Sequence, residues 1–366
     1  MRSAPQTEPV RAGIYGAGAF GCFLATSLAN SPALRVAAVA SRRHTSAQRL
    51  AARLPGLQAC QHYDSLLGRA DIECIIVATP PADHAADAAK ALEAGKHVLV
   101  EKPYAASESQ ALELAAKARR SALQSGVDFP MPYTAIVRSL VSLARSRACG
   151  RVQYVSVENV ASCEGLDAGH WCWDREKSGG IFIDHGVHIF DWCGSLLERP
   201  QRVQAWTATQ GSRENRVFAA VSYSGRQLAS YYHAFVARPD TERTRVTVVF
   251  EEVDALVDGW MPCKLTFYGA GARQAAGFVR TQNGLALTAS GPAAFCAGEK
   301  QTVYADAVRA VCADFAAAIR DPKHHRLVAQ DRAVLSVRIA DAARRAAATG
   351  AAVGLGGSAP AHAAGG

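Results

Sequence analysis

The sequence lacks several features that would define its class at once. None of its ten cysteines forms a C-x-x-C pair, so neither a zinc ribbon nor a thioredoxin-type redox motif is predicted. It has no apolar run of roughly 18 residues, which argues against a membrane span. Residues 1–9 contain no apolar stretch of the kind that a secretory signal carries. We therefore expect a cytoplasmic protein with reduced thiols and no membrane partner.

Long runs of basic residues are also missing. The formal net charge of +8 would suit a nucleic-acid-binding protein, but Lys and Arg are scattered among Ala and Leu, with no basic–aromatic block. A positive field is equally suited to a phosphorylated cofactor or an anionic substrate. We therefore expect a small-molecule substrate and no nucleic acid.

The first third of the chain alternates between strand-like and helix-like segments. The apolar run Ile72–Ala78 is typical of a parallel strand that is buried on both faces. The other predicted strands are Val10–Tyr15, Leu34–Ala40 and His97–Val100, and the predicted helices are Ala19–Asn30, Ser46–Leu54 and Ala82–Ala94. This alternation predicts an α/β Rossmann domain, with a doubly wound parallel sheet, over residues 10–128.

After about Asp128 the pattern changes to β-branched and aromatic segments joined by short turns. A helix is expected over Ala135–Arg147, followed by strands over Arg151–Val160, Arg202–Thr209, Val217–Tyr223, Gln227–Ala234 and Thr244–Phe250. Successive strands with short turns predict an α+β domain, over residues 129–350, with a large and mostly antiparallel open sheet. Ala-rich helices are expected over Val303–Ile319 and Asp331–Ala348, where they could pack back on the first domain. Residues 1–9 and 351–366 are predicted to be disordered tails.

A glycine-rich segment follows the first predicted strand and opens the first predicted helix. Residues Gly16–Gly21 match G-x-G-x-x-G, in which glycines allow a sharp turn and let backbone N–H groups approach a pyrophosphate. The pattern alone is weak, but a strand before it and a helix after it are the context that supports dinucleotide binding. The alternative is a purely structural turn.

The tip of the second predicted strand bears on the choice of cofactor. An Asp or Glu at this place binds the ribose 2′-hydroxyl in NAD-selective folds, whereas this chain has Ser41, Arg42 and Arg43. A serine hydroxyl and arginine guanidinium groups could bind a 2′-phosphate instead. We therefore favour NADP over NAD. The alternative is that the two arginines simply begin a solvated helix.

Two further segments carry residue types suited to catalysis on an oxygen-bearing carbon. Lys102 falls at the carboxyl edge of the predicted parallel sheet, where its ammonium could stabilise a developing alkoxide. Pro103 restricts Lys102 to extended backbone, which suits a held side chain. The four-residue separation of Asp184 and His188 would place both on one helix face, whereas His185 should point elsewhere. A histidine next to a carboxylate suits proton exchange near neutral pH.

Four motifs follow one another along the chain: Gly16–Gly21, Thr79-Pro80 with His84, Glu101-Lys102-Pro103, and Ser178–Asp191, which contains Asp-x-Gly-x-His. With the terminal helices, this order resembles the Gfo/Idh/MocA family, named for glucose–fructose oxidoreductase and inositol dehydrogenase, over nearly the whole chain.

The resemblance implies an NAD(P)-dependent dehydrogenase or reductase, EC 1.1.1.-, that transfers hydride between nicotinamide and a hydroxyl or carbonyl carbon of a sugar, cyclitol or related molecule. The catalytic residues are then Lys102, Asp184 and His188, with His188 as general acid/base. The residues expected to bind the cofactor are Gly16, Gly18, Ala19, Phe20, Gly21, Ser41, Arg42, Arg43, Thr79, Pro80, His84, Glu101 and Lys102. The residues expected to bind substrate are Lys102, Tyr133, Trp171, Asp184 and His188. A homo-oligomer, either dimer or tetramer, built on the exposed face of the second sheet is also implied.

The sequence leaves further alternatives open. The aromatic segment His170–Asp174 either contacts substrate or packs in the core. The set Asp184, His185, His188 and Cys172 has no recognised metal-binding spacing, so no metal is predicted. Residues 128–133 lack the basic residue that members of the family commonly have there, which favours a modified sugar, a cyclitol or a substrate outside carbohydrates.

A non-catalytic NADP sensor and a reductase of a C=C or C=N bond are the rival functions.

Overall fold

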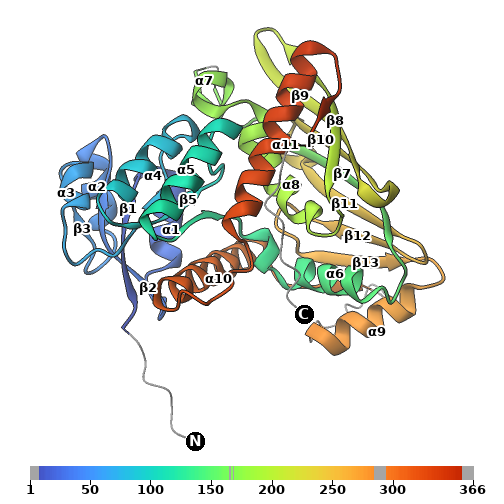
Figure 1. Cartoon of the computed structure of the whole chain (residues 1–366), viewed down its shortest axis with the longest axis horizontal. Coiled ribbons are helices and arrows are strands. Elements are labelled where there is room, and N and C mark those ends of the chain that lie inside the picture. The colour runs from blue at the N-terminus through green and yellow to red at the C-terminus, as the bar shows by residue number, and fades with distance from the viewer. Residues whose placement is uncertain (1–7, 165, 168, 284–293, 357–366) are drawn as a thin grey trace, which may run out of the picture.

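The computed structural model describes residues 8–164, 166–167, 169–283 and 294–356, and it contains two sheets that lie side by side with helices packed between them (Figure 1). The first sheet has the strands β1 (Val10–Tyr15), β2 (Leu34–Ala40), β3 (Gln58–Ala59), β4 (Cys74–Val77), β5 (His97–Glu101) and β6 (Ser125–Asp128). All pairs are parallel, in the order β3-β2-β1-β4-β5-β6. The predicted Rossmann sheet is therefore confirmed.

The helices that connect these strands are α1 (Ala19–Ser27), α2 (His44–Ala51), α3 (Tyr63–Leu67), η1 (Pro81–Asp83), α4 (His84–Glu93) and α5 (Glu108–Ser121). Side chains of β5 alternate between the faces of the sheet: Val98 and Val100 join one core cluster and Leu99 joins another. This alternation is the period-2 geometry of a strand. Glu101 and Asp128 are register partners at the carboxyl ends of β5 and β6.

The second sheet has nine strands: β7 (Val152–Ser162), β8 (Pro200–Gln210), β9 (Arg213–Tyr223), β10 (Leu228–Ala237), β11 (Arg243–Phe250), β12 (Asp254–Asp258), β13 (Lys264–Tyr268), β14 (Ala294–Cys296) and β15 (Val353–Gly354). All of its neighbouring strands pair antiparallel except β7 and β10, which pair parallel. The prediction of a mostly antiparallel open sheet is therefore confirmed.

The remaining helical elements are η2 (Met131–Tyr133), α6 (Ala135–Ser146), η3 (Trp171–Trp173), α7 (Arg175–Ser178), η4 (Phe182–Gly186), α8 (Val187–Gly194), η5 (Ser224–Arg226), η6 (Pro239–Thr241), α9 (Ala272–Asn283), α10 (Lys300–Arg320) and α11 (Gln330–Thr349). Helix α10 returns to the first domain, where Val311 and Phe315 join the core cluster that contains Leu99. Helix α11 lies between the domains and packs against α5, α8 and β8 (Figure 1). None of the described helices is long and apolar enough to cross a membrane.

The C-terminal boundary differs from the prediction. Residues 351–366 were expected to be a disordered tail, but Val353 pairs with Val203 of β8, and Leu355 is buried with its N–H donating to the carbonyl oxygen of Gln201. An apolar side chain within a Gly/Ala-rich stretch therefore adds an edge strand. Residues 357–366 of that predicted tail, and residues 1–7 of the N-terminal one, lie outside the described residues.

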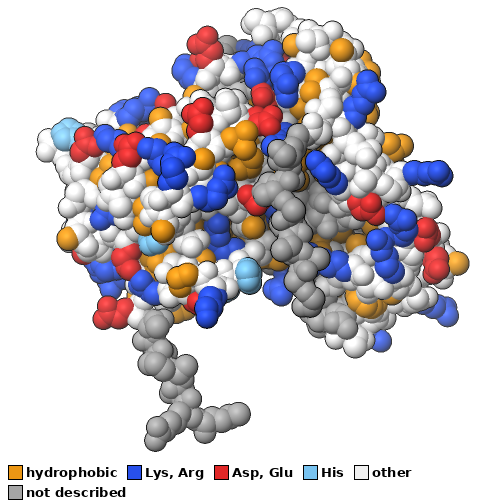
Figure 2. All heavy atoms as spheres, in the orientation of Figure 1, with side chains coloured by type: hydrophobic (Ala, Val, Ile, Leu, Met, Phe, Trp, Pro, Cys, Tyr) orange, Lys and Arg blue, Asp and Glu red, His pale blue; other side chains and the backbone are white. Residues whose placement is uncertain are grey.

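The outer face of the second sheet carries large apolar side chains. Trp206 is 53% exposed and its ring lies 5.8 Å from that of Phe218, while Leu228 and Tyr268 are 55% and 51% exposed. In contrast, the surface drawn in Figure 2 shows Lys and Arg interspersed with Asp and Glu over both domains. Exposed apolar side chains gathered on one sheet face are typical of an interaction surface.

Candidate active site

The loop between β1 and α1 is shaped for a phosphate group. Gly16 has a φ of 119°, and a Cβ added there would lie 2.2 Å from the carbonyl oxygen of Ala78. A Cβ on Gly21 would lie 1.9 Å from the carbonyl oxygen of Gly16. Only glycine fits at these two positions, because the chain turns back on itself there.

Gly18 is different, because a Cβ there would meet nothing within 4 Å. It is the N-cap residue of α1, whose first turn has no side-chain cap and no acidic residue. The N–H groups of that turn are therefore available to an anion, and the helix dipole favours one. These features fit the pyrophosphate of a dinucleotide.

His84 connects the two loops at the carboxyl edge of the first sheet. It is fully buried, with Nδ1 at 2.7 Å from the carbonyl oxygen of Pro103 and Nε2 at 2.7 Å from that of Thr79. Burial lowers the pKa of His84, and the two carbonyl oxygens act in the opposite direction. These contacts connect His84 to both loops, and its predicted contact with the cofactor stays a prediction.

Lys102 and Asp184, which are 82 residues apart, meet at the interface of the domains. The Lys102 ammonium donates to the backbone carbonyl oxygen of Asp184 at 2.9 Å and to its Oδ1 at 3.0 Å. Their side chains are only 16% and 11% exposed, so the pair is largely buried. Burial lowers the pKa of Lys102, but the carboxylates of Asp184 and Glu101 outweigh it and raise the pKa overall. Burial raises the pKa of Asp184, and the Lys102 charge reverses that shift.

The Asp-x-Gly-x-His segment does not form a regular α-helix. Phe182–Gly186 is a π-helical turn, and α8 begins immediately after it. The prediction that His185 points elsewhere is wrong. Nε2 of His185 lies 3.7 Å from Oδ2 of Asp184. The Trp260 ring lies 5.5 Å from the His185 ring and 5.4 Å from the His188 ring, so both histidines face the same tryptophan. The wider turn explains this, because residues one apart diverge less around a π-helix than around an α-helix.

An aromatic row borders this site. Trp173 lies edge-on to Phe235 at 5.9 Å, and Phe235 lies edge-on to His185 at 4.6 Å. Trp260 and His188 continue the row to Phe129, whose ring is 5.7 Å from that of His188. The half-buried Trp173, Phe235 and Trp260 could cover the apolar face of a substrate. Sequence reasoning missed Phe235 and Trp260, because they lie on strand and loop segments far from any motif.

The electrostatic surroundings of His188 favour the neutral imidazole. Burial lowers the pKa of His188 well below its usual value, and the positive charge of Lys102 together with the nearby His185 and His233 lowers it further. Nδ1 of His188 is buried and has no hydrogen-bond partner among the described residues. A neutral histidine can accept a proton from a substrate hydroxyl.

The segment before the π-helical turn reaches across to the first domain. Helix α7 packs against η1, and η3 packs against α7. Burial and the nearby Asp184 carboxylate raise the pKa of the Cys172 thiol to about 11. Trp171 is half-buried with its ring 5.5 Å from that of His170, and its predicted contact with substrate stays a prediction. Among the described residues, no group of three or more His, Cys, Asp or Glu side chains is arranged to hold a metal.

The hydroxyl group of Tyr133 has a partner on α10. It donates to Asp314 Oδ2 of α10 at 2.6 Å, and Asp314 also contacts Nε2 of His324. This bond joins η2 to α10, and the predicted contact of Tyr133 with substrate stays a prediction.

The residues that follow β2 become exposed to solvent along the chain. Ser41 is half-buried, whereas Arg42 and Arg43 are exposed, and Arg43 is the N-cap residue of α2. Arg42 lies 3.7 Å from the carboxylate of Asp83. The Arg42 guanidinium thus has a partner other than a 2′-phosphate, whereas the neighbouring Arg43 side chain is exposed to solvent.

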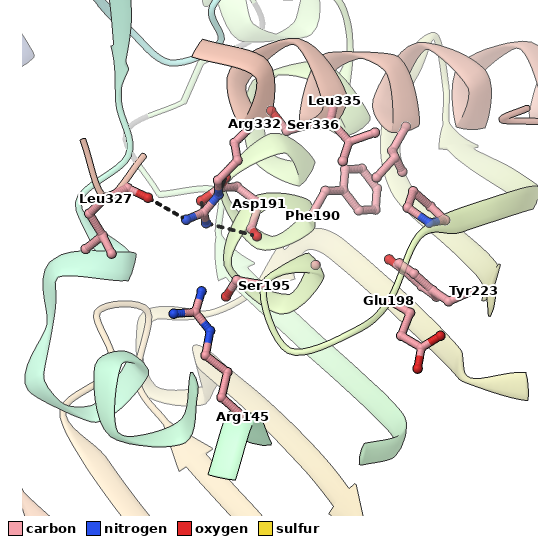
Figure 3. Close-up of a pocket in the computed structure, with 13 residues that line it drawn as sticks. Arg145, Phe190, Asp191, Ser195, Glu198, Tyr223, Leu327, Arg332, Leu335 and Ser336 are labelled. Carbon is pink, nitrogen blue, oxygen red and sulfur yellow. Dashed lines mark hydrogen bonds and ion pairs between the residues drawn. The ribbon is translucent and has the colours of Figure 1, made fainter. Parts of the chain in front are cut away.

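A separate pocket of about 210 Å³ lies behind α8, below the volume of roughly 300 Å³ at which ordinary small-molecule sites begin. In Figure 3 Arg332 of α11 reaches Asp191 of α8, and their carboxylate–guanidinium bonds are 2.8 and 3.0 Å long. Burial raises the pKa of Asp191 to about 6 against the effect of Arg332. This pair ties the helix that carries His188 to α11.

The fold and the loop geometry define a dinucleotide-binding α/β protein with a second, sheet-based domain. Residues 10–129 match the profile described as "Oxidoreductase family, NAD-binding Rossmann fold", and residues 137–254 match the "GFO/IDH/MocA C-terminal domain". The chain therefore belongs to the Gfo/Idh/MocA family, as the sequence motifs predicted.

Two curated relatives are named for reactions at position 3 of a sugar. A dTDP-3,4-didehydro-2,6-dideoxy-alpha-D-glucose 3-reductase from Saccharopolyspora spinosa is 40% identical over 50% of this chain and 54% of its own length. A D-glucoside 3-dehydrogenase from Escherichia coli is 27% identical over 55% and 57%. The chain thus spans little more than half the length of these relatives. The solved structure of levoglucosan dehydrogenase in complex with NADH and L-sorbose shares the fold, with a TM-score of 0.80 at 19% identity over 96% of this chain and 100% of that one.

Proposed function

We propose that the protein is a nicotinamide-dependent oxidoreductase that moves hydride between the cofactor and an oxygen-bearing carbon of a sugar, cyclitol or related small molecule. The observation that carries the proposal is the Lys102 ammonium held by Asp184 at the carboxyl edge of a Rossmann sheet. Ligands bind at this edge in open α/β sheets.

The chemistry of each residue follows from its contacts. An ammonium has three N–H donors, and two of those on Lys102 are used by Asp184. The third would donate to the reacting oxygen of the substrate and stabilise negative charge there. The neutral His188 would accept the hydroxyl proton during oxidation and return it during reduction. Asp184 orients Lys102 and keeps it charged.

A bound nicotinamide would accept or donate the hydride. The phosphate loop from Gly16 to Gly21 would hold its pyrophosphate, with Gly18 and Ala19 nearest to it because they are exposed at the start of α1. We propose NADP as the preferred form, since Ser41 and Arg43 offer a hydroxyl and an open guanidinium at the tip of β2. The contact between Arg42 and Asp83 makes Arg43 the more important of the two arginines.

We propose that the reacting carbon is C3 of a glucose-type ring. Both curated relatives carry position 3 in their names, one as a reductase and one as a dehydrogenase. The half-buried rings of Trp173, Phe235 and Trp260 suit the apolar face of such a ring.

The test uses a methyl glucoside and its 2-deoxy and 3-deoxy analogues with NADP⁺ or NAD⁺, and 3-keto sugars with NADPH or NADH for the reverse direction. We expect the absorbance of reduced nicotinamide to change with the glucoside, the 2-deoxy analogue or the 3-keto sugars. The 3-deoxy analogue should not react. Turnover of the 3-deoxy sugar would contradict reaction at C3, and no change with any sugar would contradict an oxidoreductase of sugars.

We propose further that the chain forms a homo-oligomer, a dimer or tetramer, through the outer face of the second sheet. The exposed Trp206, Phe218, Leu228 and Tyr268 supply the apolar surface that such an interface needs. Sedimentation of wild-type protein and of the double variant Trp206→Glu/Leu228→Glu tests this. A monomeric wild-type protein would contradict it.

We also propose a cytoplasmic location. All ten cysteines are free thiols in the structure, several of them buried in apolar surroundings. Such usage is typical of a reducing compartment. Detection of the protein only in an extracytoplasmic fraction would contradict this.

A further inference from the structure

Two acidic side chains lie next to each other directly behind Lys102. Glu101 ends β5 and Asp128 ends β6, and the two residues are register partners in a parallel pair. Neighbouring strands are separated by about 4.8 Å, so side chains on the same face are close. Both are buried, at 7% and 1% exposure, although acidic residues are almost never fully buried without a partner.

Their carboxyl oxygens are not satisfied by hydrogen bonds. Oε2 of Glu101 and both Oδ1 and Oδ2 of Asp128 are buried without a hydrogen-bond partner among the described residues. A buried charge without a partner is costly, and a group in that position usually becomes neutral. Each such group in a native structure calls for an explanation.

The groups that face the pair supply one positive charge. Lys102 is next to Glu101, but its two observed bonds go to Asp184. Helix α10 brings Tyr304 and Cys312 near the pair. Burial raises the pKa of both side chains, the nearby Asp128 adds to these shifts, and both side chains are uncharged. One ammonium therefore faces three carboxyl groups, those of Asp184, Glu101 and Asp128.

Two adjacent carboxyl groups in a dry site cannot both ionise. Burial raises the pKa of Glu101, the Lys102 charge opposes this and the nearby Asp128 adds to it, so that the pKa lies well above its ordinary value. Burial likewise raises the pKa of Asp128 to about 7. A single proton on the pair leaves one negative charge next to Lys102.

We propose that Glu101 and Asp128 form a proton-sharing pair that positions Lys102 and keeps it as an ammonium, so that Lys102 is a permanent hydrogen-bond donor and His188 alone exchanges the substrate proton. This rests on the proposed function of Lys102. Asp128 is then a positioning residue that acts through Glu101, and Glu101 acts through Lys102. The proton stays on the pair during the reaction, and no bond to substrate forms there.

The first test is infrared spectroscopy of the protein without cofactor or substrate at pH 7. The wild-type spectrum should contain the carbonyl absorption of a protonated buried carboxyl group. Asp128→Asn should lose it, because Glu101 alone beside Lys102 ionises, and Asp341→Asn, which removes an acid already paired with Arg344, should keep it. Absence of the absorption from the wild-type protein, or its persistence in Asp128→Asn, would overturn the shared proton. The absence of this absorption from the wild-type spectrum would overturn the proposal even where a variant fails to fold.

The second test is the pH dependence of kcat with a sugar substrate. Glu101→Gln removes the charge that favours the ammonium, so the pH above which activity is lost should fall by about one unit or more. Asp128→Asn leaves Glu101 charged and should not lower that pH. If kcat is lost above the same pH in the wild-type protein and in Glu101→Gln, the positioning role of Glu101 is overturned. The infrared test needs no turnover. If the protein acts on no sugar, the proposed function is contradicted, but the infrared spectrum still tests the carboxyl pair.

Discussion

The two sides of the site differ in the charges that surround the reactive group. Lys102 sits among carboxyl groups, of which Asp184 binds it directly at 2.9 and 3.0 Å and Glu101 lies beside it. His188 sits among rings, next to Phe129 and Trp260 and near two further histidines, and no described carboxylate binds it. Carboxylates raise the pKa of the lysine, whereas burial and positive neighbours lower that of the histidine.

This difference separates two roles that either side chain could have played. A lysine with a raised pKa donates hydrogen bonds but does not accept a proton, and a histidine with a lowered pKa is neutral and accepts one. We therefore propose Lys102 as the group that stabilises negative charge and His188 as the base. Substitutions at Lys102 and at His188 should separate the two roles, and the larger loss of activity is expected at His188.

The largest effect is expected from His188→Ala, which removes the only proposed base. General acid–base groups contribute roughly 10²–10⁴-fold to a rate. We expect kcat for sugar oxidation to fall by that factor, measured by steady-state kinetics. His185→Asn is the matched control, since it removes the neighbouring ring, and a loss as large as that of His188→Ala would place the base at the wrong residue.

Lys102→Met should lower kcat by about 10²–10³-fold, the cost of losing one hydrogen-bond donor to a developing oxyanion. Cofactor affinity, measured by fluorescence titration, should stay largely intact. Lys90→Met, which removes an exposed lysine paired with Asp64, should change neither quantity. Unchanged turnover in Lys102→Met would remove Lys102 from the mechanism.

Arg332→Leu tests what holds the helix that carries His188. It leaves the buried Asp191 without its cation, and breaking such a pair costs about 3–5 kcal/mol of unfolding free energy. Burial raises the pKa of Asp191 above its value in the unfolded chain, so the carboxyl group is neutral at low pH. The loss of unfolding free energy caused by Arg332→Leu should therefore be smaller at pH 5 than at pH 8. Urea denaturation at both pH values measures this, with Arg344→Leu as the surface control. An equal loss in the two variants would contradict the account.

Gly18→Ala should weaken dinucleotide binding by about tenfold without lowering the melting temperature, because its Cβ enters open space that we give to the pyrophosphate. The φ of Gly18, −77°, is one that alanine also adopts. Gly16→Ala, by contrast, should destabilise the loop itself, since its Cβ would collide with Ala78. Unchanged cofactor affinity in Gly18→Ala would show that the phosphate lies elsewhere.

A smaller effect should appear in the pH dependence of oxidation. His188 must be neutral to act as base, and its pKa lies well below 6.5, so activity should decline only as the pH falls below that value. The Lys102 charge contributes to this low pKa. The residual activity of Lys102→Met should therefore begin to decline at a higher pH than that of the wild-type protein, as measured by kcat/KM profiles. The opposite shift would contradict the coupling of the two sides.

The parts of the molecule that follow from local rules were predictable from the sequence. The glycine spacing before a helix predicted the loop at Gly16–Gly21, and the apolar runs predicted the parallel sheet. The position of Lys102 at the carboxyl edge follows from the end of β5 at Glu101.

Other parts depend on tertiary packing and were not predictable. The π-helical turn at Phe182–Gly186 has no recognised sequence signature here, and it brings His185 into the site against the expectation from α-helical spacing. Trp260 and Phe235 reach the site from separate parts of the second sheet. Asp128 meets Glu101 only through strand register, which the sequence does not specify.

The most direct test of the central claim is a fluorescence titration of the purified protein with NADPH and, separately, with NADH. The account predicts saturable binding, tighter for NADPH, with the preference reduced by Arg43→Ala. Tighter binding of NADH would contradict the role given to Ser41 and Arg43 while leaving the oxidoreductase in place. Binding of neither nucleotide would contradict the account as a whole.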